Sequence, residues 1–456
     1  MRASLPVLAL FAAALPSAAR ADFVTDWIVF AHQMEAKLPP ARGVPPTAGE
    51  HAYDVSQVAL AMFEALNAID PAYQSVVGLP PAEPGASPEA AAATAAHQVL
   101  KACLPAQAKE LDDSYAIAMA GVLDTAAREK GQRAGEAAAA AALKRGGVDP
   151  GLKQSPYRPL MAPGTWSATD LPVFEPFVLA FRPWAMPSAA ALRPPPPPKL
   201  SSERWAKDYE EVKRFGGKTA SSRTPAQTIV ARYRVAPDIM PTAAWIADQP
   251  GRRPVQNARM HARLAMAAND ITIAIADAKL HYNFWRPISA IRNADKDGNA
   301  KTELDPGWAP LLATPNHPEY PCGHCIFAAG EATVLADEGI LPPDGVRFRT
   351  QAATAILERV PTLDAYVQTV SDSRIYAGVH YRFSNEAAED MGRKAARLVL
   401  DKLMQPLGSL KAAALGPCFH PQSALPSVRW SRCRQSGARR DRSPAPPRGR
   451  VAVWPR

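Results

Sequence analysis

The sequence predicts an all-α fold in which helices pack as a bundle. The chain has 456 residues, of which 47% are hydrophobic, enough for one large core or two moderate ones. Alanine is abundant, aromatic residues account for 7%, and there are 47 prolines. These features together predict helices interrupted by proline-rich loops, with little sheet.

The N-terminal segment 1–21 has the form of a secretory signal peptide. Arg2 precedes an apolar run that ends in Ala19, Arg20 and Ala21, with cleavage expected after the last of these. The run is short for a membrane span, and no later stretch reaches the ~18 unbroken apolar residues that a span needs. We therefore expect a periplasmic or secreted protein with no membrane span once the signal is removed.

The net charge of +9 does not indicate a nucleic-acid partner. Residues 421–456 carry nine arginines and one aspartate, so most of the excess positive charge lies at the C-terminal end. Without this end and the signal peptide the body is close to neutral, which argues against binding to a polyanion. Because the end lacks apolar periodicity, residues 411–456 are predicted to be a disordered basic tail.

The body is predicted to consist of an N-terminal helical region, 22–200, and a C-terminal helical bundle, 201–410. In the first, apolar spacing predicts a helix over 52–70, and residues 86–146 are helix-prone. The run LRPPPPPK, residues 192–199, favours an extended surface crossing, because proline is excluded from the interior of helices and sheets.

Within the C-terminal bundle the chain is predicted to be densely helical from about Pro254, and it includes one long helix. This helix runs from Met260 to about Trp285, because the residue before Pro287 disfavours helix. This half of the chain carries every candidate site residue. Further helices are expected over 324–338, 347–358, 362–376 and 385–404.

Lys279 and Arg286 lie seven residues apart near the end of the long helix. Seven residues is close to two turns, so both side chains are expected on one face, about 10 Å apart along the axis. Two cations on one face could hold a tetrahedral anion from two sides. For this pair alone, a solvated basic edge is the simpler interpretation.

The segment PCGHC, residues 321–325, adds a second element of an anion site. Pro321 blocks helix before it, Gly323 gives the backbone room, and a helix is expected to begin at about His324. A glycine turn that feeds a helix N-terminus presents unpaired N–H groups to an anion, and His324 at its rim could act as general acid or base. Zinc binding and a redox CxxC pair are alternatives, but the first lacks a second ligand pair and the second a βαβ pattern. A structural disulfide remains open.

The segment SDSRIYAGVHYRFS, residues 371–384, supplies a third element. Arg374 is expected at the end of a helix that Gly378 terminates, and His380 follows before the next helix opens near Ser384. Gly378 allows the bend that would bring Arg374 and His380 together. Three cations, two histidines and a glycine-turn helix start thus fall within about 100 residues of one helical half.

Three segments resemble, in order, the signature motifs of the vanadium-dependent haloperoxidase and type-2 phosphatidic acid phosphatase (PAP2) superfamily. They are KLHYNFWRP, PCGHC and SRIYAGVHYRF. The wording of FWRPISAIR, HPEYP and GVHYRF is closer to the haloperoxidase branch than to the membrane lipid phosphatases, and the likeness spans roughly residues 50–405. The resemblance implies the helical bundle typical of this superfamily and a bound vanadate or phosphate.

The resemblance also implies a role for each residue of the motifs. His324 would be the acid–base group. His380 would be the axial ligand that bonds vanadium in a peroxidase or attacks phosphorus in a phosphatase. The equatorial oxygens would be bound by Lys279, Arg286, Arg374 and the backbone N–H of Gly323.

Two residues depart from the family pattern. Cys322 stands where the family has serine, so a hydroxyl donor becomes a weak thiol donor, or no donor if it is oxidised to a disulfide. Ser384 stands where an aspartate orients the axial histidine; it could still form a hydrogen bond or cap the next helix, and Glu386 or Asp390 could substitute for the aspartate. The resemblance also implies that His317 lies at a halide-side position, where algal bromoperoxidases have histidine too, and this implies bromide rather than chloride.

The sequence thus predicts an exported vanadium-dependent haloperoxidase that oxidises halide with hydrogen peroxide at a His-bound vanadate and halogenates a small organic acceptor. One alternative is a soluble PAP2-type acid phosphatase with a phosphohistidine intermediate, which needs no vanadate. Another is a degenerate member that binds an oxyanion without turnover. A homo-oligomer is compatible with the sequence.

Overall fold

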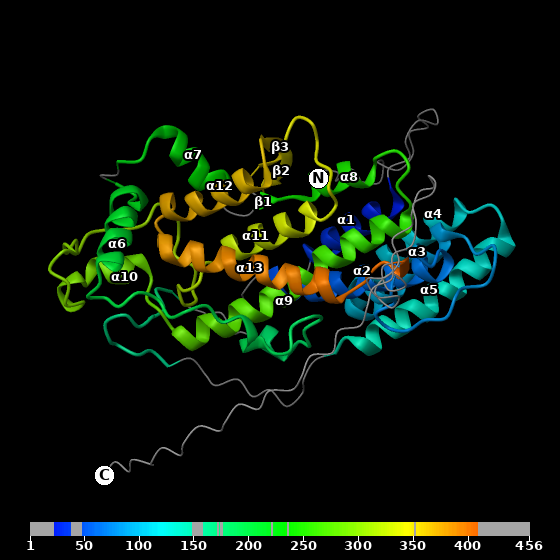
Figure 1. Ribbon diagram of the computed structural model, residues 1–456, viewed down its shortest axis with the longest axis horizontal. Helices are drawn as coiled ribbons and strands as arrows, with labels where there is room; N and C mark the ends of the chain where they lie inside the picture. Colours follow the sequence, from blue (N-terminus) through cyan, green and yellow to red (C-terminus); the bar gives the residue numbers. More distant parts are fainter. Residues whose placement is uncertain are drawn as a thin grey trace, which may run out of the picture. The chain divides into compact units, whose positions relative to one another are not determined.

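The computed structural model is mainly helical, as the sequence predicts (Figure 1). The predicted signal peptide and basic tail lie outside the described residues. The structure describes residues 22–37, 48–147, 158–170, 173, 177–219, 222–234, 237–350 and 353–408.

Helices make up nearly all of the regular structure in these ranges. The α-helices are α1 (Phe23–Glu35), α2 (Ala48–Ile69), α3 (Pro88–Cys103), α4 (Ala108–Ala120), α5 (Thr125–Arg145), α6 (Glu203–Gly216), α7 (Pro225–Tyr233), α8 (Met240–Ala247), α9 (Pro254–Tyr282), α10 (Pro287–Arg292), α11 (Gly323–Ala336), α12 (Leu363–Tyr376) and α13 (Arg382–Lys402). The 3-10 turns are η1 (Pro105–Gln107), η2 (Phe177–Ala180), η3 (Ala189–Leu192) and η4 (Ala294–Lys296). The strands are β1 (Pro237–Asp238), β2 (Val346–Thr350) and β3 (Ala353–Val360).

The helices predicted in the N-terminal region are present. The helix expected over 52–70 is α2, and the helix-prone stretch 86–146 divides into α3, α4 and α5. Ser87 and Asp124 cap α3 and α5, since each side chain accepts a hydrogen bond from the amide three residues on. The proline run 192–199 continues from η3 without helix or strand.

A shared hydrophobic core joins the two halves of the chain. Helix α2 packs against α3, α5 and α9, and α3 fills the space between α2 and α5 with buried alanines. Buried side chains from Val24 to Met404 belong to the same cluster, so residues near both ends of the described chain contribute to one core. The helices that carry the site are therefore built onto this common support.

Helix α9 runs through the molecule and binds the loops around it with buried charged groups. Asp270 Oδ1 accepts a hydrogen bond from the Trp184 amide at 2.7 Å, and its Oδ2 accepts from the amides of Ala185 and Met186 at 2.8 and 3.0 Å. Arg263 donates to Asp337 at 2.8 Å.

In the part of the chain that the structure describes, no helix has both the length and the apolar character needed to cross a membrane.

Helices α11 and α13 position the site because their first turns lie together. Both pack against α9 and against one another (Figure 1). Gly392 of α13 faces Gly330 of α11, and a Cβ on Gly392 would lie 2.1 Å from the carbonyl oxygen of Ile326. At their starts, the Cys322 amide donates to the Ser384 carbonyl at 3.2 Å. Glycine at this crossing thus permits the close approach that joins the two helix starts.

The helix predicted over 347–358 is wrong. Residues 347–350 lie in β2 and residues 353–358 in β3; the two strands pair antiparallel, and β1 adds a third strand beside β2. In β2, Val346, Phe348 and Thr350 are buried, whereas Arg347 and Arg349 are more exposed. This alternation has the period of a strand with one covered face, and burial of Phe348 and Val346 against the helices outweighs the helix propensity of the neighbouring alanines.

A buried histidine ties α1 to α9. The Thr25 hydroxyl lies 2.8 Å from His261 Nε2 and donates its own proton to Asp22, so the imidazole donates from Nε2. Burial lowers the pKa of His261 to about 4, although Asp22 acts in the opposite direction. Above about pH 6.5 the folded and unfolded chains both carry a neutral His261, and below it only the unfolded chain readily takes up the proton.

We therefore expect His261 to make the fold sensitive to acid. Its contribution falls by about 2 kcal/mol between about pH 6.5 and pH 5, because the proton binds more tightly to the unfolded chain. Urea unfolding of the His261→Gln variant should show a flatter pH dependence than the parent protein, with the exposed His281→Gln variant as the control. Equal loss of stability in His261→Gln and the parent over this range would contradict this assignment.

Candidate oxyanion site

The three predicted cations come from different elements and are buried in one region. Lys279 lies in the last turn of α9, Arg286 is the N-cap residue of α10, and Arg374 lies in the last turn of α12. Their exposed fractions are 6%, 0% and 2%. Burial lowers the pKa of each cation. Arg286 further lowers the pKa of Lys279 and of Arg374, which shows that the three charges act on one another.

The seven-residue spacing predicted that Arg286 projects from the same face of α9 as Lys279. This prediction is wrong, because Arg286 lies beyond the end of the helix. Helix α9 ends at Tyr282 because Asn283 adopts a left-handed conformation with φ of 43°, which asparagine tolerates better than most residues. The chain then runs beside Thr165, which bridges to Phe284. Arg286 reaches the site through this turn, and helix periodicity is not the reason for its position.

Arg286 connects the segments that carry His317 and His380. Its Nε donates to the His317 carbonyl at 3.0 Å, and its NH2 lies 3.0 Å from His317 Nδ1. Its NH1 donates to the Val379 carbonyl at 2.8 Å and lies 3.2 Å from His380 Nε2. The predicted halide-side histidine and the predicted axial histidine therefore contact the same guanidinium group.

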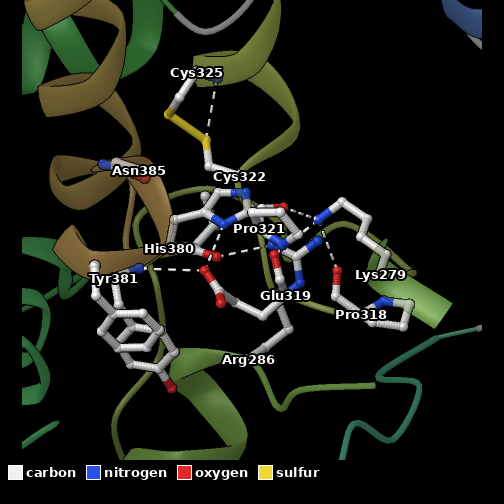
Figure 2. Close-up of polar contacts among 12 residues, drawn as sticks. Lys279, Arg286, Pro318, Glu319, Pro321, Cys322, Cys325, His380, Tyr381 and Asn385 are labelled. Carbon is white, nitrogen blue, oxygen red and sulfur yellow. Dashed lines mark hydrogen bonds and ion pairs between the residues drawn. A yellow bond between two sulfur atoms is a disulfide. The ribbon is translucent and has the colours of Figure 1, made fainter. Parts of the chain in front are cut away.

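Lys279 fixes the turn that leads into α11. Its Nζ donates to the carbonyls of Pro318 at 3.0 Å and Glu319 at 2.8 Å, and also to that of Pro321 (Figure 2). These bonds use all three ammonium protons. The side chain passes Gly323 closely, since a Cβ on that glycine would lie 4.0 Å from Lys279 Cε. Lys279 thus places positive charge beside the helix start while its donors hold the backbone.

A disulfide closes the first turn of α11. Cys322 and Cys325 are joined, and Cys322 Sγ accepts a hydrogen bond from the Cys325 amide at 3.3 Å. A disulfide sulfur carries no proton, so the predicted binding of an oxyanion by the Cys322 side chain is wrong for this oxidised form. Both sulfur atoms are also unavailable as zinc thiolates. The helix begins at Gly323, one residue before the predicted start, and its first amides have no carbonyl partner within the helix.

His380 is held by a carboxylate that the sequence analysis did not identify. Its Nδ1 lies 2.6 Å from Glu319 Oε1, and both side chains are buried, with exposures of 1% and 0% (Figure 2). A carboxylate only accepts hydrogen bonds and a guanidinium only donates them, so Nδ1 carries the proton and Nε2 faces Arg286 with its lone pair. Burial, reinforced by Arg286 and Lys279, keeps the pKa of His380 well below its ordinary value. The imidazole is therefore neutral.

The two carboxylates proposed from the sequence as partners of His380 are engaged elsewhere. Glu386 pairs with Arg204 at 2.8 Å, and Asp390 pairs with Lys394 at 2.6 Å. The expectation that either one substitutes for the family aspartate is wrong, because both lie on partly exposed faces of α13. The sequence signal for the actual partner was the acidic residue in HPEYP, directly before the PCGH motif.

Ser384 lies close to the Glu319 carboxylate but does not cap α13. The N-cap is Tyr381, and Ser384 is the third residue of the helix. Burial raises the pKa of Glu319 to about 7, while Arg286, Lys279 and the nearby Ser384 hydroxyl act to lower it. Ser384 acts on this pKa as a hydrogen-bond donor, so its hydroxyl lies beside the Glu319 carboxylate.

The buried guanidinium of Arg374 has unused donors, and its charge acts on His324. Its Nε and NH1 bond to no acceptor among the residues that the structure describes. Burial lowers the pKa of His324, and Arg374, Lys279 and Arg286 lower it further, so this histidine lies within the field of all three cations. A buried guanidinium with unused N–H groups costs about 1–3 kcal/mol or more, and an anion that accepts these bonds would remove that cost. The site thus fits an oxyanion.

Aromatic side chains form an apolar wall beside the charged groups. Trp205 of α6 lies 5.1 Å from Tyr381 and 5.8 Å from Trp285, measured between ring centroids. The flanking neighbours of Arg286, Glu319 and His380 belong to the same buried cluster. A wall of this kind excludes water and strengthens the attraction between the cations and a bound anion. The aromatic members are Trp205, Tyr209, Phe284, Trp285, Trp308, Tyr320, Tyr381 and Phe383.

The helical fold brings buried cations and histidines into one region, and comparisons with known proteins show which fold this is. Residues 259–409 match the family model of the VCPO second helical-bundle domain. A structure described as the first bacterial vanadium-dependent iodoperoxidase aligns with a TM-score of 0.66 and 19% identity, covering 84% of this chain and 96% of that chain. No curated protein matches the sequence.

Two further structures show the same architecture. The holo-type bacterial vanadium-dependent chloroperoxidase aligns with a TM-score of 0.58 and 18% identity over 83% of this chain and 92% of that one. The apo-type bacterial vanadium-dependent chloroperoxidase aligns with a TM-score of 0.60 and 18% identity, covering 80% of this chain and 95% of that chain. The chain therefore has the vanadium haloperoxidase fold, and residues 259–409 are similar to the VCPO second helical-bundle domain. This confirms the predicted superfamily and the all-α fold.

Proposed function

We propose that the protein is an exported vanadium-dependent haloperoxidase that oxidises halide with hydrogen peroxide and halogenates a small organic acceptor. The observation that carries this proposal is the excess of buried positive charge. Lys279, Arg286 and Arg374 are buried together, and Glu319 is the carboxylate whose charge raises the pKa of the first two. A vanadate anion would balance this excess positive charge and accept hydrogen bonds from the unused N–H groups of Arg374.

Each residue of the candidate site has a distinct role in the proposed reaction. Arg374 and the backbone amide of Gly323 would bind the anion, and the charges of Lys279 and Arg286 would stabilise it without reorganising. His380 would hold vanadium through the lone pair of Nε2. Bound vanadate would act as a Lewis acid that activates peroxide, and neutral His324 would accept the proton that peroxide releases.

The halide preference is part of the same proposal. Arg286 NH2, which can only donate, lies 3.0 Å from His317 Nδ1, so this imidazole belongs to the charged cluster. We propose bromide rather than chloride as the physiological halide. Iodide, named for one structural neighbour, is the easiest of the three to oxidise and serves as the permissive substrate in a test.

The test is an assay of the full-length protein after loading with orthovanadate. Halogenation of an organic acceptor is expected with iodide and bromide, to depend on vanadate, and to be suppressed by excess phosphate that competes for the same site. Hydrolysis of an aryl phosphate without vanadate, inhibited by vanadate and with no halogenation, would overturn the proposal in favour of a phosphatase. Stoichiometric binding of vanadate without either activity would overturn it in favour of a non-catalytic member. Export is tested by N-terminal sequencing, which should begin at Asp22.

A further inference from the structure

We propose that Glu319 is the positioning residue of His380, replacing from the loop before α11 a carboxylate that α13 does not supply. The inference deepens the proposed function and rests on His380 binding vanadium. Glu319 precedes the helix that carries His324, so one short segment would orient both histidines of the site. Ser384, on the first turn of α13, lies beside this carboxylate and lowers its pKa as a hydrogen-bond donor.

The position of Glu319 is fixed on three sides. Its amide donates to the Phe284 carbonyl at 2.9 Å, and its own carbonyl accepts from Lys279 Nζ at 2.8 Å. Its side-chain Oε1 meets His380 Nδ1 at 2.6 Å and the Tyr381 amide at 3.3 Å. The backbone of Glu319 is held by contacts that are independent of its side chain. The carboxylate is therefore held in place to orient the His380 imidazole (Figure 2).

This contact determines which nitrogen of His380 is free to bind. With the proton of Nδ1 committed to Glu319, Nε2 keeps its lone pair, and Arg286 NH1 at 3.2 Å disfavours a proton there. A carboxylate on the far nitrogen also makes Nε2 a stronger electron donor. Both effects would strengthen a bond from Nε2 to vanadium.

A merely structural ion pair makes a different prediction. Removing the charge of Glu319 leaves a more cationic site, so every oxyanion should bind equally well or more tightly. A positioning role lowers the affinity only for an anion that bonds to Nε2. Phosphate is held in its ground state by charge and hydrogen bonds alone, whereas vanadate adds a bond to the imidazole. The ratio of the two affinities therefore separates the roles.

The test compares vanadate and phosphate binding to the full chain by calorimetry at about pH 8. In Glu319→Gln, whose amide oxygen still accepts from the Tyr381 amide, we expect the ratio of vanadate to phosphate affinity to fall about 10- to 100-fold. Phosphate affinity should stay equal or rise, which also shows that the site remains folded. The matched control is Glu386→Gln, a carboxylate on α13 that pairs with Arg204, and it should leave the ratio unchanged.

A relocated carboxylate provides the second arm. Adding Ser384→Asp to Glu319→Gln should restore part of the lost ratio, because position 384 faces the same carboxylate site. An unchanged ratio in Glu319→Gln would overturn the positioning role while leaving the oxyanion site intact. A parent protein that binds neither anion would instead overturn the proposed function itself.

Discussion

Replacement of His380 by alanine is expected to eliminate vanadate-dependent halogenation, with a fall of at least about 10²-fold in turnover. The imidazole is buried, neutral and oriented by Glu319, and Nε2 is the atom placed to bond vanadium. Without it the cations still attract an oxyanion but cannot fix its axial position. Phosphate affinity should therefore change little while vanadate affinity falls.

The measurement for His380→Ala is the halogenation rate at saturating vanadate, together with calorimetric affinities for both anions. His281→Ala is the matched control, because this histidine lies in the last turn of α9 with an exposed side chain. Halogenation at the parental rate in His380→Ala would show that the axial ligand lies elsewhere. Equal loss in the control would show a general effect of histidine removal.

Replacement of Arg374 by methionine is expected to separate binding from stability. Each charge-assisted hydrogen bond contributes about 1.5–3 kcal/mol, so losing the donors at Nε and NH1 should weaken oxyanion affinity by at least about 10²-fold. The same donors are buried and bond to no described acceptor. An apolar side chain of similar length removes their desolvation cost, so the free energy of unfolding of the anion-free protein should rise by about 1–3 kcal/mol.

Both quantities are measured on the Arg374→Met variant, by calorimetry with phosphate or vanadate and by urea unfolding in anion-free buffer. Arg393→Met on α13 is the control, since Arg393 is partly exposed and pairs with Glu389 at 3.4 Å. It should alter neither affinity nor stability by more than a small amount. Unchanged anion affinity in Arg374→Met would remove this arginine from the site.

The sequence predicted the elements of the site better than the way they meet. The helices that carry Lys279, His324 and Arg374 are present, and Gly378 has the positive φ of 79° that lets the chain turn back toward the site. These features depend on local signals, namely apolar periodicity, proline exclusion and glycine freedom. Such signals act within a few residues and are legible in one sequence.

Three features depended on contacts that local patterns do not encode. Arg286 reaches the site because Asn283 ends α9 early, and spacing alone suggested a continuous helix. Residues 346–350 and 353–360 form strands because the β2 side chains pack into a core formed by distant helices. Glu319 partners His380 across 61 residues, and nothing in the order of the motifs required the carboxylate to come from the loop. In all three, contacts between residues distant in the sequence determine the structure.

The central claim is that Lys279, Arg286, His324, Arg374 and His380 surround one oxyanion. A crystal structure of the protein soaked with vanadate, with anomalous data collected at the vanadium edge, tests this most directly. We expect a single strong vanadium peak at bonding distance from His380 Nε2, with its oxygens facing Arg374 and the first turn of α11. A vanadium peak at another site, with none beside His380, would contradict it.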